Sequence, residues 1–139
     1  MINILVVEDE ENIRNIIKKV LEREGYHIFL AATGEEGFDI IEKVHIDLIV
    51  LDLMLPDIDG YQFTKELRDA RYEIPILMAT AKQLPADKHK GFLVGTDDYM
   101  TKPLDMDEFV LRIRALLRRS KIASERQIVI GKVTLHYDS

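Results

Sequence analysis

The chain has 139 residues and a net charge of −6, and 47% of its residues are hydrophobic and 32% charged. This length and composition suit one domain with a hydrophobic core, and the chain is too short for two complete domains. It contains no cysteine, so disulfides and thiolate metal sites are excluded. No apolar run approaches the roughly 18 residues of a membrane span, and the N-terminus lacks a secretory signal. We therefore expect a cytoplasmic protein that does not enter the membrane. The net negative charge disfavours strong binding of nucleic acids.

Short apolar runs alternate with longer amphipathic stretches along the chain. The runs cover residues 4–7, 28–31, 47–51, 75–79 and 98–101, and most are rich in leucine or in β-branched residues. Because they lack alternation of polar and apolar residues, they are typical of strands covered on both faces, as in a parallel sheet. The sequence therefore predicts five strands at these places.

The stretches between the runs predict helices. Apolar residues recur at helical spacing over residues 13–21, and Gly25 follows as a stop signal. Further helices are predicted over residues 33–44 and 61–70, with a weaker one over 86–94. A long last helix carries apolar residues from Phe109 to Leu117, with Asp105 as its N-cap. This alternation predicts a (βα)₅ chain with a doubly wound α/β fold.

The end of the chain breaks this pattern. Residues 121–126 lose the apolar stripe and are interpreted as a linker. Residues 127–139 contain two short apolar runs around Gly131 and Lys132, which predict two strands. Such strands have no partners inside a closed five-stranded domain, so we interpret them as the beginning of a further domain.

Charged or hydroxyl-bearing residues stand immediately after four of the predicted strands. Glu8 and Asp9 follow the first strand, Asp52 the third, Thr80 the fourth and Lys102 the fifth. In an open α/β sheet, ligands bind beyond the carboxyl ends of the strands, near the place where the strand order reverses. Each residue alone has an ordinary explanation as a surface or strand-end residue. Their occurrence after four different strands favours a common site.

The chemistry of these side chains indicates a metal-assisted transfer reaction. Clustered carboxylates repel one another and need a counter-charge, and a hard cation that keeps several waters, such as Mg²⁺, suits carboxylate oxygens. A lysine and a hydroxyl beside such a metal can neutralise an incoming phosphoryl group. Asp52 would then be the carboxylate nucleophile that forms an aspartyl phosphate.

These residues lie in four stretches that resemble a two-component response regulator: ILVVEDE, DLIVLDLMLPDIDG, PILMATA and GTDDYMTKPLDMDEFVLRIRALLRR. The last of them and the tail IVIGKVTLHYDS resemble the OmpR/PhoB subfamily of DNA-binding regulators. The resemblance implies a flavodoxin-like receiver domain over residues 1–120, with a five-stranded parallel sheet of strand order 2-1-3-4-5. It also implies a linker over residues 121–126 and the first strands of a truncated winged-helix DNA-binding domain over residues 127–139.

The resemblance implies a phosphoacceptor and a metal site. Asp52 is expected to accept a phosphoryl group from a sensor histidine kinase, with Mg²⁺ as the cofactor. The implied metal-binding residues are Glu8, which acts through water, Asp9, Asp52, and Met54, which offers its backbone carbonyl.

The phosphoryl group itself is expected to contact Thr80, Lys102 and the backbone N–H of Ala81. The peptide bond between Lys102 and Pro103 is expected to be cis, which aims the lysine. Thr80 and Tyr99 are expected to act as a switch, in which phosphorylation biases an existing equilibrium between two conformations.

In the same subfamily, phosphorylation promotes dimerisation through the surface of the fourth helix, the fifth strand and the fifth helix. We name this surface the dimer face, and its implied residues are Lys88, Phe92, Asp97, Asp98, Glu108, Val110, Arg112 and Arg119. The implied charge pairs between the two chains are Lys88 with Glu108, Asp98 with Arg112, and Asp97 with Arg119. Phe92 and Val110 would form an apolar centre within these charges. The dimer would control transcription through DNA bound by the missing domain.

Three other interpretations share part of this pattern. A metal-dependent phosphatase with an aspartyl-phosphate intermediate would use the same acids, but it needs a cap over its substrate and the predicted loops are too short for one. A stand-alone receiver domain would not carry the strands predicted after residue 127. A receiver that has lost phosphorylation would not need the acids together with Lys102. We therefore expect no enzymatic activity beyond self-phosphorylation and self-dephosphorylation.

Overall fold

The computed structural model describes residues 1–81 and 95–132, with side chains as far as Lys121. Its elements in chain order are β1 (Asn3–Val7), α1 (Glu11–Arg23), β2 (His27–Ala31), α2 (Gly34–Lys43), β3 (Leu48–Leu51), α3 (Gly60–Asp69), β4 (Ile76–Thr80), β5 (Asp98–Thr101) and α5 (Met106–Lys132). The bounds of all five strands agree with the predicted runs to within one residue at each end.

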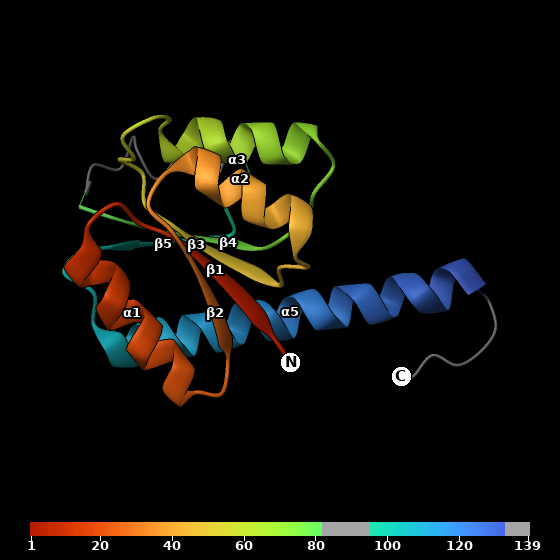
Figure 1. Ribbon diagram of the computed structural model, residues 1–139. Coiled ribbons are helices and arrows are strands. Elements are labelled where there is room, and N and C mark those ends of the chain that lie inside the picture. Colours follow the sequence, from red (N-terminus) through yellow and green to blue (C-terminus); the bar gives the residue numbers. More distant parts are fainter. Residues whose placement is uncertain (82–94, 133–139) are drawn as a thin grey trace.

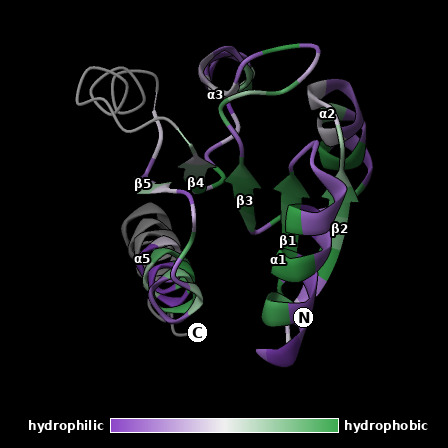
Figure 2. Cartoon of the chain, turned by 90° about the vertical axis from the view of Figure 1, so that its left-hand side faces the viewer, coloured by the Kyte–Doolittle hydropathy of each residue, from purple (hydrophilic) through white to green (hydrophobic). Residues whose placement is uncertain are grey.

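Within the described residues, the strands form one parallel sheet in the order β2-β1-β3-β4-β5 (Figure 1). Helices α1 and α5 cover one face of the sheet, and α2 and α3 cover the other (Figure 2). The strand order reverses at β1, because the chain first adds β2 on one side and then crosses to β3 on the other. The predicted doubly wound fold and strand order are confirmed. In such folds ligands bind beyond the carboxyl ends of the strands at the reversal, which here are the ends of β1 and β3.

The central strands are buried on both faces, as the unbroken apolar runs predict. In β1, Leu5 and Val7 pack in the core beneath α2 and α3, whereas Ile4 and Val6 pack in the core beneath α1 and α5. All four side chains are fully buried, and burying one such side chain contributes about 1.5–3 kcal/mol. Polar groups are therefore excluded from the strands and gather at the strand ends.

Polar caps fix where α2 and α3 begin. The Thr33 hydroxyl accepts the Glu36 N–H at 3.1 Å, and the Glu36 carboxylate accepts the Ala32 N–H at 2.8 Å. Asp59 caps α3 by accepting the Gln62 N–H at 2.8 Å. Each cap satisfies a backbone donor that the first helical turn leaves without a partner, which stabilises the helix by about 1 kcal/mol.

The last helix differs from the prediction. α5 continues to Lys132, so residues 121–126 are helical where a linker was expected, and residues 127–132 are helical where a strand was expected. Figure 1 shows the C-terminal half of α5 projecting beyond the sheet, where it has no described strand as a neighbour. A helix satisfies backbone hydrogen bonds within one segment, whereas a strand needs a partner. The proposed division into domains stays a prediction.

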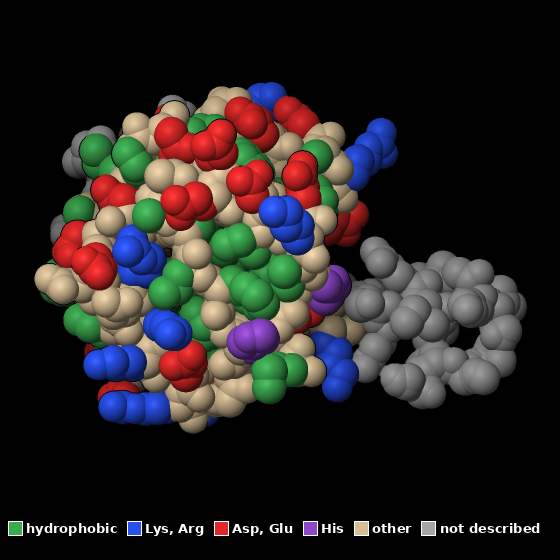
Figure 3. All heavy atoms as spheres, viewed as in Figure 1, with side chains coloured by type: hydrophobic (Ala, Val, Ile, Leu, Met, Phe, Trp, Pro, Cys, Tyr) green, Lys and Arg blue, Asp and Glu red, His purple; other side chains and the backbone are tan. Residues whose placement is uncertain are grey.

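Some expected features fall outside the part of the chain that the structure describes. These are the helix expected over residues 86–94, the dimer-face residues Lys88 and Phe92, and residues 133–139. Of the helices that are described, none is both long and apolar enough to cross a membrane. Acidic side chains gather over α2 and α3 (Figure 3), which gives this surface a charge that repels the phosphates of nucleic acids.

Candidate metal centre

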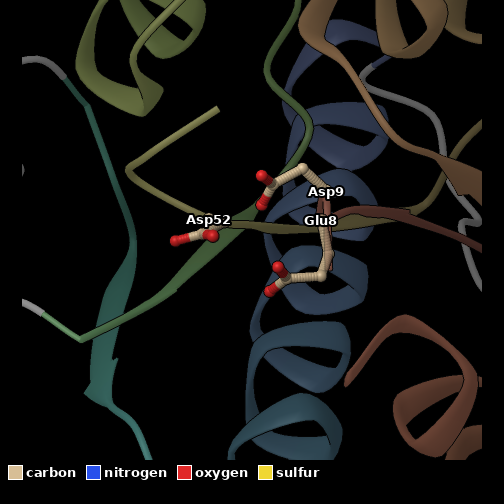
Figure 4. A group of neighbouring side chains, drawn as sticks. All are labelled: Glu8, Asp9 and Asp52. Carbon is tan, nitrogen blue, oxygen red and sulfur yellow. The ribbon is translucent and has the colours of Figure 1, made fainter. Parts of the chain in front are cut away.

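Three carboxylates meet beyond the carboxyl ends of β1 and β3. One oxygen from each of Glu8, Asp9 and Asp52 lies within 4.8 Å of the others, and Figure 4 shows the three side chains around a common space. Glu8 is 2% exposed and Asp52 is 6% exposed, whereas Asp9 is exposed. The group therefore has a buried side and a side that is open to water.

The parallel strand pairing explains why these residues come together. The Glu8 N–H donates to the Ala31 carbonyl at 3.0 Å, and the Asp52 N–H donates to the Val7 carbonyl at 3.0 Å. These bonds continue the pairing of β1 with β2, and of β3 with β1, by one residue beyond the strand ends. The acids that follow the two strands are thereby held next to each other, as predicted from the sequence.

Lys102 reaches the same acids from the end of β5. Its Nζ lies 2.6 Å from Glu8 Oε1 and 3.3 Å from Asp52 Oδ2, and its peptide bond to Pro103 is cis, as predicted. Burial raises the pKa of Glu8 by more than the hydrogen bond from Lys102 lowers it. Burial alone would lower the pKa of Lys102, but the hydrogen bond to Glu8 and the charge of Asp52 raise it. The ammonium group therefore stays protonated and offsets part of the charge of the two carboxylates.

The donor atoms fit a hard divalent cation. Glu8, Asp9 and Asp52 offer oxygen atoms, which are the ligands that Mg²⁺ and Ca²⁺ prefer. Three carboxylates are few for Ca²⁺, whereas Mg²⁺ commonly keeps several waters in its coordination sphere. The exposed side at Asp9 gives those waters access. The acidic group predicted from the sequence is thus present in a form that can hold a metal, and the choice of Mg²⁺ stays a prediction.

Arg14 of α1 supports this site, and the sequence did not predict it. Its Nη1 donates to the carbonyl of Glu8 at 2.8 Å and to the carbonyl of Asp9 at 3.3 Å. The Glu10 N–H donates to Glu8 Oε2 at 3.1 Å. The guanidinium thus holds the turn that carries both acids. An arginine in an amphipathic helix resembles any solvent-exposed residue, so its sequence position gives no signal for this contact.

The remaining residues of the predicted site lie at the same edge of the sheet. Thr80 ends β4 and is fully buried, and Ala81 follows it in an exposed position. The Lys102 N–H donates to the Thr80 carbonyl at 2.8 Å, so β4 and β5 end side by side. The Met54 N–H donates to Asp52 Oδ1 at 3.3 Å, which places the Met54 backbone beside that acid. The roles of these residues toward a phosphoryl group stay predictions.

Tyr99, the expected partner of Thr80 in the switch, lies inside the fold. It is 6% exposed and belongs to the apolar core beneath α2 and α3. The pairing of β4 with β5 places Tyr99 beside Met78 and Thr101 beside Thr80. Tyr99 is therefore one strand away from Thr80 and two positions before the strand end, and its function as a switch stays a prediction.

Several charges of the dimer face are paired within the chain. Arg112 lies 2.7 Å from Asp98 and 2.7 Å from Glu108, and Asp97 lies 3.1 Å from Arg68 of α3. The expected pairing of Asp98 with Arg112 of a second chain would therefore require an exchange of partners. The other described residues of this face are Val110, which is half-buried, and Arg119, which is exposed.

The chain is similar in sequence to proteins of one family over most of its length. The family model described as the response regulator receiver domain matches residues 4–114. The alkaline phosphatase synthesis transcriptional regulatory protein PhoP of Bacillus subtilis (strain 168) is 45% identical and aligns with 98% of this chain and 62% of its own length. The heme response regulator HssR of Staphylococcus aureus (strain MRSA252) is 40% identical and aligns with 98% of this chain and 60% of its own length.

Solved structures share the fold. The structure of the Francisella response regulator 1452 receiver domain matches with a TM-score of 0.83 at 32% identity, over 86% of this chain and 99% of that one. The chain spans about 60% of the length of the two curated relatives, whereas it matches an isolated receiver domain over nearly the whole of that domain.

Proposed function

This chain belongs to the response regulator receiver domain family, and we propose that it acts by accepting a phosphoryl group on Asp52 from a sensor histidine kinase. The observation that carries the proposal is the meeting of Glu8, Asp9 and Asp52 within 4.8 Å, with Lys102 in contact with two of them. Such a group has both a carboxylate nucleophile and the positive charge that phosphoryl transfer requires.

The proposed step is a substitution at phosphorus. An oxygen of Asp52 forms a bond to phosphorus while the bond from phosphorus to the kinase histidine breaks, and the imidazole leaves. Mg²⁺ held by Glu8, Asp9 and Asp52 would neutralise charge on the phosphoryl oxygens, as metals do in such transfers. Lys102, which already lies 3.3 Å from Asp52, would pair with another of these oxygens.

Other groups at the strand ends would complete the site. The Thr80 hydroxyl and the Ala81 N–H would donate to the remaining phosphoryl oxygens, and the Met54 carbonyl would add a ligand to the metal. The chemistry is confined to an aspartate of the chain itself, so we propose no enzymatic activity on a separate substrate. A cytoplasmic location, where kinases supply the phosphoryl group, belongs to the same proposal.

The proposed output is control of transcription. The similarity to PhoP, which is named a transcriptional regulatory protein, supports the OmpR/PhoB assignment and a DNA-binding domain in the full-length protein. Phosphorylation would act through Thr80 and Tyr99 on the dimer face, where two chains would associate. Since Arg112 is held within its own chain by Asp98 and Glu108, dimerisation would include an exchange of these ion pairs.

Phosphorylation with acetyl phosphate and Mg²⁺ is expected to convert the chain from monomer to dimer, and Arg112→Glu is expected to prevent this conversion. Reversal of the charge removes the pair with Asp98 and adds repulsion, which costs several kcal/mol when like charges are brought together at an interface. Sedimentation velocity gives the oligomeric state, and intact mass gives the phosphorylated fraction of each sample. If the wild type and Arg112→Glu dimerise equally at equal phosphorylation, the dimer face is not the surface through which the two chains associate.

The phosphoacceptor is tested by intact mass after incubation with acetyl phosphate. The wild-type chain is expected to gain one phosphoryl group in the presence of Mg²⁺ and none in the presence of EDTA. Asp52→Ala removes the nucleophile and is expected to gain none under either condition. No gain by the wild type would mean that this receiver fold has lost phosphorylation and switches by other means.

A further inference from the structure

The loop between β3 and α3, residues 53–59, is tied to α2, which supplies none of the three carboxylates of the metal centre. Asp57 Oδ1 accepts the N–H of Gly34 at 2.9 Å, and Asp57 Oδ2 accepts the N–H of Glu35 at 2.9 Å. Both donors belong to the first turn of α2, whose N–H groups have no partner inside the helix. One side chain from the 53–59 loop thus joins that loop to the start of α2.

The charge of Asp57 suits this position. The hydrogen bond from Gly34 is the main cause that lowers the pKa of Asp57 below its ordinary value. A carboxylate at the N-terminus of a helix also interacts favourably with the helix dipole. Asp57 therefore binds both amides as an ionised group, even though Glu35 and Glu36 lie in the same first turn.

Close packing accompanies the hydrogen bonds. A Cβ atom on Gly34 would lie 2.2 Å from Ile58 Cγ2, which is far inside van der Waals contact. Gly34 is buried, and Ile58 packs against the core beneath α2 and α3. The approach of the 53–59 loop to α2 therefore depends on a glycine at position 34 as well as on the carboxylate at position 57.

The other end of this loop lies at the metal centre. The Gly60 N–H donates to the Leu53 carbonyl at 2.7 Å, and Met54 pairs with Asp59 in an antiparallel bridge. These contacts close the base of the loop directly beside Asp52, and the Met54 N–H donates to Asp52 Oδ1 at 3.3 Å. Asp57, which binds α2, belongs to the same short loop as Met54, so a displacement of the loop away from α2 is expected to move the Met54 backbone relative to Asp52.

We propose that Asp57 is a positioning residue that anchors the 53–59 loop to α2 and thereby holds the Met54 backbone and the Asp52 carboxylate in the geometry that binds the metal. The inference rests on the proposed function, because the metal is part of that proposal. It assigns to α2 a part in the site although the three carboxylates come from other segments of the chain. Loss of a group that orients the ligands of a metal commonly lowers the affinity of the protein for that metal by about 10-fold to 100-fold.

The affinity of the complete chain for Mg²⁺ tests this inference, measured by isothermal titration calorimetry. Asp57→Ala and Gly34→Ala are each expected to weaken Mg²⁺ binding about tenfold. Asp57→Ala removes the carboxylate that binds α2. Gly34→Ala keeps that carboxylate but pushes Ile58 away from α2. Asp57→Asn keeps one acceptor oxygen and is expected to lie between Asp57→Ala and the wild type. Asp69→Ala, which removes an exposed carboxylate paired with Lys65, is the matched control and is expected to bind like the wild type.

A second readout separates positioning from a simple loss of stability. In the metal-free protein, the amide signal of Met54 in a proton–nitrogen NMR spectrum is expected to shift in Asp57→Ala and in Asp57→Asn, and to stay in place in Asp69→Ala. The double variant Asp57→Ala with Gly34→Ala is expected to lose less affinity than the product of the single losses, since both substitutions break one contact.

The outcomes distinguish this inference from the proposed function. If the wild type binds Mg²⁺ and accepts phosphate, and Asp57→Ala and Gly34→Ala bind Mg²⁺ equally well, the anchoring role is wrong and the proposed function stands. If the wild type neither binds Mg²⁺ nor accepts phosphate, both are wrong. If Asp57→Ala fails to fold, Asp57→Asn and Gly34→Ala test the anchoring role instead. An unchanged affinity for Mg²⁺ together with an unchanged Met54 amide signal in these variants would overturn the inference.

Discussion

Replacement of Lys102 with methionine is expected to lower the free energy of unfolding by about 3 kcal/mol when divalent cations are removed with EDTA. The Lys102 ammonium lies 2.6 Å from Glu8 and 3.3 Å from Asp52, and those carboxylates are 2% and 6% exposed. Methionine has similar length and no charge, so it leaves two buried acids facing each other without a cation. One of them must then take up a proton or remain as an unbalanced charge, and either outcome destabilises the folded state.

Urea denaturation at neutral pH measures this effect. The control is Lys65→Met, which breaks an exposed pair with Asp69 and is expected to change stability by less than about 1 kcal/mol. Addition of Mg²⁺ is expected to restore part of the stability lost by Lys102→Met, because the metal supplies the missing positive charge. An equal effect of the two lysine substitutions would show that Lys102 does not balance the acids.

Phe63→Ala is expected to lower the free energy of unfolding by about 4 kcal/mol. Phe63 is fully buried in α3, and its ring stacks on Phe38 of α2 with centroids 4.3 Å apart. Its ring atoms also lie where Cβ atoms on Gly34 and Gly37 would come within 3.5 Å and 3.2 Å. Gly37 thus lets α2 approach this ring closely, since a Cβ at that position would be tighter than ordinary van der Waals contact, and alanine at position 63 would leave a cavity between the two helices.

Thermal or urea denaturation checks this prediction. Tyr72→Ala is a suitable control, because Tyr72 is 37% exposed and its truncation opens no enclosed cavity, so we expect a loss of about 1 kcal/mol. A loss below about 1 kcal/mol for Phe63→Ala would contradict the packing of α2 on α3 through this ring. Such a result would also count against the inference that Asp57 anchors the 53–59 loop to α2, because that inference relies on the same packing of α2.

The strands and most of the acidic site could be predicted from the sequence because their signals are local. An apolar run such as that of β1 predicts burial on both faces, and its Leu5 and Ile4 do enter opposite cores. Once five such runs are accepted as parallel strands, the residues that follow them must lie along one edge of the sheet. Glu8, Asp9 and Asp52 were found in this way.

The supporting contacts could not be predicted, because each joins residues with no local pattern. Asp57 binds amides that are 23 and 22 positions earlier in the chain, and its place in a turn explains its presence without any such partner. Arg14 has the composition of a helix surface. α5 continues to Lys132, past the helix predicted from the apolar stripe, because β-branched residues favour strands only weakly and the context of the segment decides its conformation.

Localisation of the phosphoryl group in the sequence decides whether Asp52 is the phosphoacceptor. After incubation with acetyl phosphate and Mg²⁺, reduction with borohydride converts an aspartyl phosphate into homoserine, which tandem mass spectrometry locates in the sequence. Homoserine is expected at position 52 and at no other position, and none is expected in the presence of EDTA. Homoserine at Asp9 or at another aspartate, or none at position 52 despite a gain of phosphoryl mass, would contradict the assignment of Asp52 as the phosphoacceptor.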